Sequence, residues 1–157
     1  DDIWYEPFKG LGAYYDKFPV DEQFRRWTEI DFGLDFFKFN EKVDVICTNP
    51  PYSLLTPVFK HCAKLRPRVI NLLIGTLNLT RTRMNIMADA GYIMTYMHLL
   101  EVKGWFGCSI IIQYELEECI KAPACDCGEY YGTAGIGHTK NMIKHPDGGL
   151  YGAALVK

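Results

Sequence analysis

Four consecutive residues, Asn49, Pro50, Pro51 and Tyr52, carry groups suited to binding a planar amine or amide. The side-chain oxygen of Asn49 and the backbone carbonyl of Pro50 can each accept a hydrogen bond, and the proline ring holds its carbonyl on a stiff backbone. Tyr52 adds a flat aromatic face on which a ring can stack. These residues predict a site for chemistry on an NH2 group. The alternative is a plain strand-ending turn in which Tyr52 packs on a proline.

The strand that positions this tetrapeptide is the apolar run over residues 43–48, which predicts a buried β-strand. Two successive prolines cannot continue a hydrogen-bonded ladder, so the strand must end there and leave Asn49 at its carboxyl end. Ligands of open α/β sheets bind at that edge. We therefore expect residues 49–52 to face a binding crevice.

A second chemical feature follows the short β-prone run over residues 3–5. Gly10 and Gly12 are separated by one residue, which allows a tight turn and a close approach of the backbone to a ligand. A strand followed by such a turn is typical of the cofactor crevice in doubly wound folds. No Gly-Lys-Ser/Thr follows and the third glycine of the dinucleotide fingerprint is missing, which argues against nucleotide phosphates.

Glu29 stands at the end of the next predicted strand, over residues 24–30. A carboxylate at that place can accept hydrogen bonds from both hydroxyls of a ribose. Glu29 is thus the candidate ribose ligand, with Asp31 as a neighbour that could exchange roles with it. The alternative is a solvated acid in a loop.

The tetrapeptide resembles the (Asp/Asn/Ser)-Pro-Pro-(Tyr/Phe/Trp) motif of the S-adenosylmethionine-dependent amino-methyltransferases. Residues 6–12, Glu-Pro-Phe-Lys-Gly-Leu-Gly, resemble the (Asp/Glu)-Pro-Phe-x-Gly-x-Gly segment that binds the methionine part of the cofactor in that family. The resemblance implies that S-adenosylmethionine is the cofactor. It also implies cofactor contacts from Glu6, Pro7, Phe8, Gly10 and Gly12.

The same family has an (Asp/Asn)-(Phe/Ile/Leu) pair after its third strand, and that pair touches the adenine of the cofactor. Asp35 and Phe36 match the pair. By resemblance, Asp35 accepts the amino hydrogen of the adenine and Phe36 packs on the ring. We assign the neighbouring aromatic residues Phe37 and Phe39 to the core.

All these elements occur in the family's order, which identifies the chain as similar to the compact adenine methyltransferases of phages and large viruses. The resemblance implies methyl transfer to the exocyclic amine of adenine in DNA, on a base that has left the stack. Tyr52 stacks on that base, while Asn49 and Pro50 accept its two amine hydrogens. The alternatives are an RNA amine or a protein glutamine amide as acceptor, and an inactive methyltransferase fold that serves as a binding subunit.

Further substrate contacts are predicted at Ser53, beside the tetrapeptide, and at Arg81 and Arg83, in the loop over residues 78–83 next to the crevice edge. Arginines at a crevice edge can contact the phosphates of a nucleic acid. The alternative for the arginines is a solvated helix start. Ser53 can also cap a helix that runs to about Leu65.

The rest of the pattern alternates strands and helices. Three more strands are expected, over residues 69–74, 92–100 and 107–115. A second helix is expected to begin at a cap formed by Thr80 or Thr82 and to end near Gly91. This pattern predicts an α/β fold with a mostly parallel sheet closed by an antiparallel edge hairpin. The resemblance implies the Rossmann-like class I methyltransferase fold, with helices on both faces and seven strands in the order 3-2-1-4-5-7-6.

The chain has 157 residues, 48% of them apolar, which fits a single domain with a substantial core. We expect a catalytic core over residues 1–116 and an extension of the same domain over residues 117–157, irregular or a short hairpin. The formal net charge of −2 argues against a surface that coats nucleic acid. The expected partner is nevertheless a nucleic acid, most of all DNA, with a homodimer or a separate specificity partner supplying recognition.

Six cysteines are scattered along the chain, and Cys47, Cys62 and Cys108 lie in apolar patterns typical of reduced core thiols. Cys125 and Cys127 invite a zinc interpretation, but the spacing of the nearby histidines is loose, and we predict no metal. No apolar run is long enough to cross a membrane, and the first residues lack a signal-peptide pattern. A cytoplasmic or nuclear protein is therefore expected.

Overall fold

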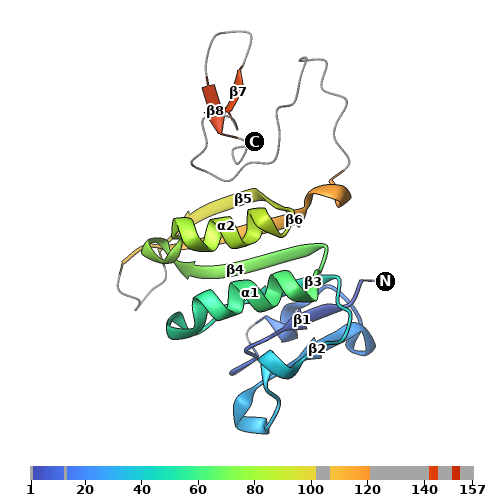
Figure 1. Ribbon diagram of the computed structural model, residues 1–157. Coiled ribbons are helices and arrows are strands. Elements are labelled where there is room, and N and C mark those ends of the chain that lie inside the picture. The colour runs from blue at the N-terminus through green and yellow to red at the C-terminus, as the bar shows by residue number, and fades with distance from the viewer. Residues whose placement is uncertain (1, 13, 102–106, 121–141, 145–149, 153–157) are drawn as a thin grey trace.

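Six strands of the described residues form the main sheet, in the order β2-β1-β3-β4-β6-β5 (Figure 1). The computed structural model describes residues 2–12, 14–101, 107–120, 142–144 and 150–152. In chain order the six strands are β1 (Trp4–Glu6), β2 (Arg25–Trp27), β3 (Val45–Thr48), β4 (Val69–Gly75), β5 (Tyr92–Leu100) and β6 (Ser109–Leu116). The strands β2, β1, β3 and β4 are parallel, whereas β6 is antiparallel to both β4 and β5. The predicted parallel sheet with an antiparallel edge hairpin is confirmed.

The observed order is the predicted seven-stranded order with its strand 3 left out. Within the described residues, the corresponding segment forms two short 3₁₀ helices, Ile30–Phe32 and Phe36–Lys38. The side chains of Glu29 and Asp35 accept hydrogen bonds from the first turns of these helices, and Gly33 has a left-handed φ of 76°. These local bonds compete with a sheet ladder, so the segment turns instead of extending along β2.

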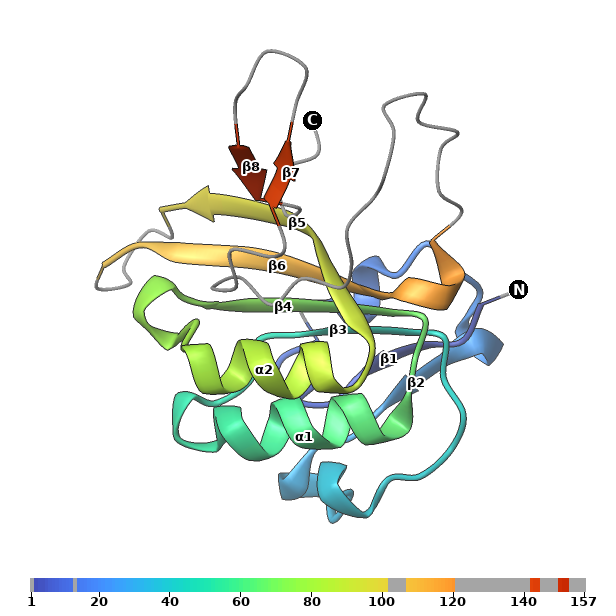
Figure 2. The same ribbon diagram turned by 45° about the horizontal axis from the view of Figure 1, so that its top comes forward.

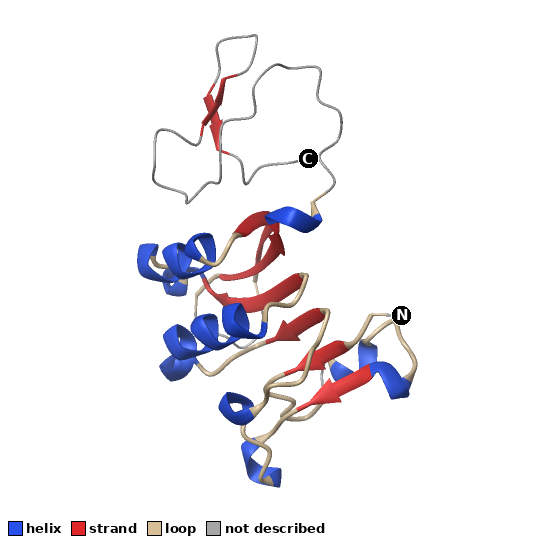
Figure 3. Cartoon of the chain, turned by 45° about the vertical axis from the view of Figure 1, so that its right-hand side comes forward, coloured by secondary structure: helices blue, strands red, loops and turns tan. Residues whose placement is uncertain are grey.

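Two α-helices, α1 (Leu55–Leu65) and α2 (Arg81–Asp89), lie side by side on one face of the sheet (Figures 1 and 2). Figure 3 shows both of them on the same side of the strands. This differs from the predicted arrangement, which had helices on both faces. The connection from β1 to β2 forms only the short 3₁₀ helices Tyr15–Lys17 and Glu22–Phe24, so in the described part of the chain it adds no α-helix to the second face.

The starts of the two α-helices are less regular than predicted. Ser53 lies in a 3₁₀ turn, Tyr52–Leu54, and α1 begins after it without a side-chain cap, so the predicted capping role of Ser53 is wrong. Thr80 does occupy the residue before α2, although its side chain forms no capping hydrogen bond. The predicted end of α2 is confirmed, because Gly91 follows with a left-handed φ of 81°.

The core lies between the sheet and the two α-helices. Along β4, Ile70, Leu72 and Ile74 alternate toward the helices and are fully buried, and Ile112 of β6 joins them. Buried apolar surface of this kind is the main source of stability. On the other face of the sheet, the alternate residues of β4 and β6, such as Asn71, are half-buried.

The aromatic residues and cysteines that the sequence assigns to the core differ in how deeply they are buried. Phe39 stacks on the fully buried Tyr5 with ring centroids 4.1 Å apart, as a core assignment requires. Cys62 is buried, and burial raises the pKa of its thiol to about 12. Cys47 is half-buried. Cys108 is exposed, so its core assignment is wrong; it precedes the first residue of β6, outside the alternation that buries that strand.

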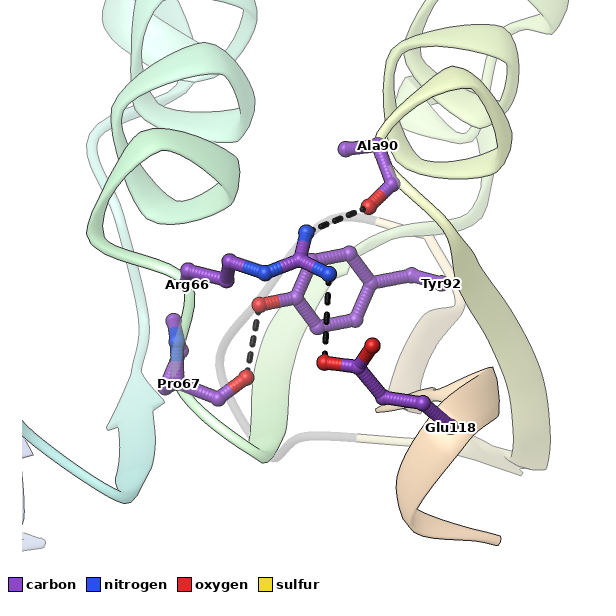
Figure 4. A network of polar contacts seen from close by, with 5 residues as sticks. All are labelled: Arg66, Pro67, Ala90, Tyr92 and Glu118. Atoms are coloured by element: carbon purple, nitrogen blue, oxygen red, sulfur yellow. Dashed lines mark hydrogen bonds and ion pairs between the residues drawn. The ribbon is translucent and has the colours of Figure 1, made fainter.

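A polar network joins the end of α1 to the turn between α2 and β5 (Figure 4). Arg66 has a left-handed φ of 54° and donates hydrogen bonds to the carbonyl of Ala90 and to Glu118, each 3.2 Å long. The buried hydroxyl of Tyr92 donates to the carbonyl of Pro67 at 2.6 Å. These bonds satisfy the backbone carbonyl at the C-cap of α2 and one in the turn between α1 and β4.

A separate two-stranded antiparallel sheet pairs β7 (Met142–Lys144) with β8 (Leu150–Gly152). The proposed division of the chain after residue 116 stays a prediction. None of the helices in the described residues combines the length and the apolar character needed to cross a membrane.

Candidate active site

A cavity of about 710 Å³ opens where the parallel strands end at their carboxyl edge, and we call it the edge cavity. Its volume lies within the range of about 300–1,000 Å³ that is usual for small-molecule sites. Ten of its lining residues were predicted from the sequence: Pro7, Phe8, Gly10, Glu29, Asp35, Phe36, Asn49, Pro50, Pro51 and Tyr52. Four others were not predicted as site residues: Ile30, Leu34, Phe37 and Leu54.

The glycine turn after β1 has the geometry that its sequence predicts. Gly10 and Gly12 have positive φ angles of 50° and 79°, which residues with a Cβ adopt only at a cost. No atom lies within 4 Å of the place where a Cβ would stand on Gly10. The backbone of Gly10 is therefore open to the edge cavity, and a ligand can approach it closely.

Glu29 lines the edge cavity next to the glycine turn. Its Oε2 accepts a hydrogen bond of 2.7 Å from the backbone N–H of Gly10, and its Oε1 accepts one of 2.9 Å from Ile30. Each carboxylate oxygen keeps a further lone pair for a ligand hydroxyl. Asp31, the alternative ribose ligand, is exposed and does not line the edge cavity.

Glu6 and Gly12 stabilise the glycine turn from outside the edge cavity. Glu6 is buried, does not line the edge cavity, and its Oε2 accepts a 2.6 Å hydrogen bond from the backbone N–H of Tyr15. Burial raises the pKa of the Glu6 carboxyl to about 7, although backbone N–H donors oppose the shift. Gly12 is buried against Asp16 and is likewise outside the lining. These two residues hold the turn in place.

Asp35 and Phe36 line the edge cavity on the side of Glu29, one with a carboxylate and the other with an aromatic ring. The Oδ1 of Asp35 accepts a 2.9 Å hydrogen bond from the backbone N–H of Phe37. Phe36 is 3% exposed and packs edge-on against Phe8, with centroids 5.1 Å apart. Phe37 lines the edge cavity and is 37% exposed, so its assignment to the core is wrong. Successive residues of a 3₁₀ turn point in different directions, which sends Phe36 inward and Phe37 outward.

The tetrapeptide forms the opposite wall. Pro50 is buried, Asn49 is half-buried and Tyr52 is 47% exposed. The Tyr52 side chain leans toward the end of the neighbouring strand β4: a Cβ added to Gly75 would lie 3.5 Å from the tyrosine oxygen and 3.2 Å from Nδ2 of Asn78. The absence of a side chain at Gly75 leaves room for both groups.

The structure does not place the remaining predicted substrate residues in the edge cavity. Ser53 and Arg81 are exposed and lie outside its lining. Arg83 is half-buried, and its guanidinium donates to Oγ1 of Thr56 and to the backbone carbonyl of Asn78. Arg83 therefore joins α1, α2 and the loop between β4 and α2.

Four lining residues were missed because their position depends on distant parts of the chain. Ile30, Leu34 and Leu54 are exposed apolar residues, at 66%, 43% and 37%. Their closeness to predicted site residues was the only available signal. Among the described residues, no group of three or more His, Cys, Asp or Glu side chains is placed to bind a metal. Cys125 and Cys127 lie outside the described residues.

No protein-family model and no curated protein sequence matches the chain. Among solved structures, it is similar to magnesium protoporphyrin IX methyltransferase from Synechocystis PCC 6803 with bound SAM (TM-score 0.52, 11% identity, 73% of this chain and 69% of that chain). The chain has a Rossmann-like methyltransferase fold. Precorrin-6y C5,15-methyltransferase from Geobacter metallireducens GS-15 (TM-score 0.51, 12% identity, 73% and 78%) shares this methyltransferase fold. A methyltransferase from Pyrococcus furiosus does so too (TM-score 0.51, 15% identity, 73% and 74%).

Proposed function

We propose that this protein is an S-adenosylmethionine-dependent methyltransferase that acts on the exocyclic amine of adenine in DNA. The observation that carries the proposal is the convergence of four short segments on the edge cavity. These segments are the turn at Gly10, the residue Glu29, the pair Asp35-Phe36, and the tetrapeptide over residues 49–52. Two of the solved structures with the same fold contain SAM or SAH.

The donor set fits the proposed cofactor. The open backbone at Gly10 suits the methionine part, and the Glu29 carboxylate suits the ribose hydroxyls. Phe36 and Phe37 provide apolar surface for an adenine ring, beside the carboxylate of Asp35. When bound, the cofactor supplies an electrophilic sulfonium methyl group.

The tetrapeptide supplies the acceptor side of the reaction. The side-chain oxygen of Asn49 and the carbonyl of Pro50 accept the two hydrogens of the target amine, which frees the nitrogen lone pair for in-line attack. Tyr52 stacks on the ring that carries the amine. No strong base is needed before attack, because the proton can leave the nitrogen afterwards. Positioning and electrostatic stabilisation therefore account for the chain's share of the catalysis.

The fold alone does not select the methyl acceptor, because one fold hosts many substrates. The support for DNA is the Asn-Pro-Pro-Tyr sequence together with the half-exposed Tyr52 at the wall of the edge cavity, where a base turned out of the duplex can reach it. With a net charge of −2, the chain offers little general attraction for DNA. We therefore propose that a second copy or a separate specificity partner adds to recognition.

Methyl transfer from tritiated S-adenosylmethionine to pools of DNA, RNA and protein tests the proposal. We expect label in DNA, recovered after digestion as N6-methyladenine. Label confined to RNA or to protein glutamine contradicts DNA as the substrate but is still consistent with an S-adenosylmethionine-dependent methyltransferase. Cofactor binding by calorimetry without transfer to any pool indicates a binding subunit, and no binding at all contradicts the whole proposal.

A further inference from the structure

Leu77 is a large apolar side chain that stands almost entirely in solvent. It is 94% exposed and lies in the 3₁₀ turn Thr76–Asn78, directly after β4. A single exposed leucine is ordinary on a protein surface. Leu77 differs in two respects. Hydrogen bonds anchor the backbone on both sides of it, and it lies next to the tetrapeptide side of the edge cavity.

The backbone around Leu77 is anchored on both sides. The N–H and the hydroxyl of Thr76 both donate to the carbonyl of Cys108, at 3.1 and 3.2 Å. On the other side, the carbonyl of Asn78 accepts a hydrogen bond from the Arg83 guanidinium and another of 3.1 Å from the N–H of Thr80. The turn is therefore fixed in advance, and an exposed side chain on it loses little backbone entropy when it contacts a partner.

The position of Leu77 relates it to the acceptor side of the edge cavity. The strand β4 pairs with β3 in parallel, so Leu77 and the tetrapeptide follow neighbouring strands at the same edge of the sheet. Gly75, two residues before Leu77, adjoins the hydroxyl of Tyr52. The glycine turn follows β1, on the other side of β3. Leu77 thus flanks the wall that would hold the methyl acceptor.

We infer that Leu77 is a wedge that enters duplex DNA beside the target adenine and occupies the space that the turned-out base leaves. This inference rests on the proposed function. A base must leave the stack before its amine can reach Asn49, and the loss of stacking costs free energy. An apolar side chain that fills the vacated space shields the faces of the neighbouring bases from water and offsets part of that loss. Leu77 is a positioning residue in this account, because it acts on the neighbouring bases and not on the reacting atoms.

The test compares Leu77→Ser with Leu77→Phe, and uses Leu99→Ser as a matched control. Leu99 is 62% exposed on the edge strand β5, and the strand β6 lies between it and β4, which Leu77 follows. Each protein methylates one oligonucleotide sequence in two forms, as a duplex and as a single strand. For Leu77→Ser we expect the ratio of duplex to single-strand kcat/KM to fall about tenfold, since only the duplex needs base extrusion. We expect Leu77→Phe and Leu99→Ser to keep the ratio of the unsubstituted protein.

A second readout uses 2-aminopurine at the target position of the duplex. We expect its fluorescence to rise when the unsubstituted protein binds and to rise much less with Leu77→Ser. Equal loss of activity on both forms of DNA, or no loss at all, overturns the wedge and leaves the proposed function intact. If the unsubstituted protein methylates no DNA of either form, the proposed function fails and the wedge fails with it.

Discussion

The backbone N–H of Gly10 donates a 2.7 Å hydrogen bond to the carboxylate of Glu29, nineteen residues later in the chain. This bond ties the glycine turn after β1 to the end of β2. Because Gly10 and Glu29 both line the edge cavity, the bond fixes two walls of the proposed donor site relative to each other. A hydrogen bond to a charged group of this kind is stronger than a neutral one.

Glu29→Gln tests the donor site. The amide keeps the size of the side chain but has only one oxygen, so it cannot accept from Gly10, Ile30 and a ribose as the carboxylate can. We expect S-adenosylmethionine to bind roughly 10–100-fold more weakly, as measured by calorimetry, for a loss of charged hydrogen bonds. Asp31→Asn is the control and should bind normally. Weakening by Asp31→Asn alone would show that the two acids have exchanged roles.

Asn49→Ala tests the acceptor site. Removal of the side-chain oxygen leaves one amine hydrogen without its acceptor in the transition state, so we expect kcat to fall about 100–1,000-fold. Cofactor binding should stay nearly unchanged, since Asn49 acts on the acceptor. Single-turnover transfer measures the first quantity and calorimetry the second. Asn40→Ala, at an exposed position outside the edge cavity, should change neither. Retained turnover with lost cofactor binding would refute the assignment.

Gly75→Ala tests the contact between β4 and Tyr52. The added methyl group would lie 3.2 Å from Asn78 Nδ2, which must move by a few tenths of an ångström, and 3.5 Å from the Tyr52 oxygen, which is an ordinary van der Waals contact. Gly75 has an ordinary φ of −68°, and we expect stability to change by less than about 1 kcal/mol. The methyl group fills the space beside Tyr52 and limits the movement of its ring, so we expect a modest fall in kcat/KM for the methyl acceptor, with cofactor binding unchanged.

Gly91→Ala is the control for Gly75→Ala, and we expect it to lower stability without lowering the rate. Gly91 has a left-handed φ of 81° and lies outside the edge cavity, so the substitution should cost about 1–2 kcal/mol of stability without affecting turnover per folded molecule. Thermal unfolding and initial rates distinguish the two glycines. Equal effects of Gly75→Ala and Gly91→Ala on rate and stability would show that the Tyr52 contact has no functional part.

Glu6 predicts a dependence of stability on pH. Its pKa is about 7 in the folded protein, against 4.5 without the protein environment, because the carboxyl is buried. Between these values the folded protein keeps a proton that the unfolded chain has released. The free energy of unfolding therefore falls as pH rises through this window, by on the order of 3 kcal/mol in all.

Thermal unfolding from about pH 5 to about pH 8 checks this prediction. Glu6→Gln stays neutral throughout, and it should remove the part of the decline that Glu6 causes. Glu22→Gln, at an exposed acid, is the matched control and should leave the decline in place. An unchanged decline in Glu6→Gln would mean that the carboxyl is not desolvated in the folded protein.

The sequence by itself determined the features that depend on a few neighbouring residues. Two prolines end β3 and leave Asn49 directly after its last residue, and two glycines allow the turn after β1, whatever the rest of the chain does. Since both strands are parallel, these two local signals also place the turn and the tetrapeptide at one edge. For that reason the glycine turn and the tetrapeptide could be found before the structure.

Only the tertiary structure decided which other side chains reach the edge cavity. Phe37 was assigned to the core and lines the edge cavity, whereas Arg83 was assigned to substrate and binds the loop after β4. The direction of the Phe37 side chain depends on a short 3₁₀ turn, and that of Arg83 depends on partners from other elements. The periodicity of apolar residues in the sequence predicts neither of these directions. In the part of the chain that the structure describes, β2 is the edge strand, and the side-chain bonds of Glu29 and Asp35 favour turns over a further strand beside it.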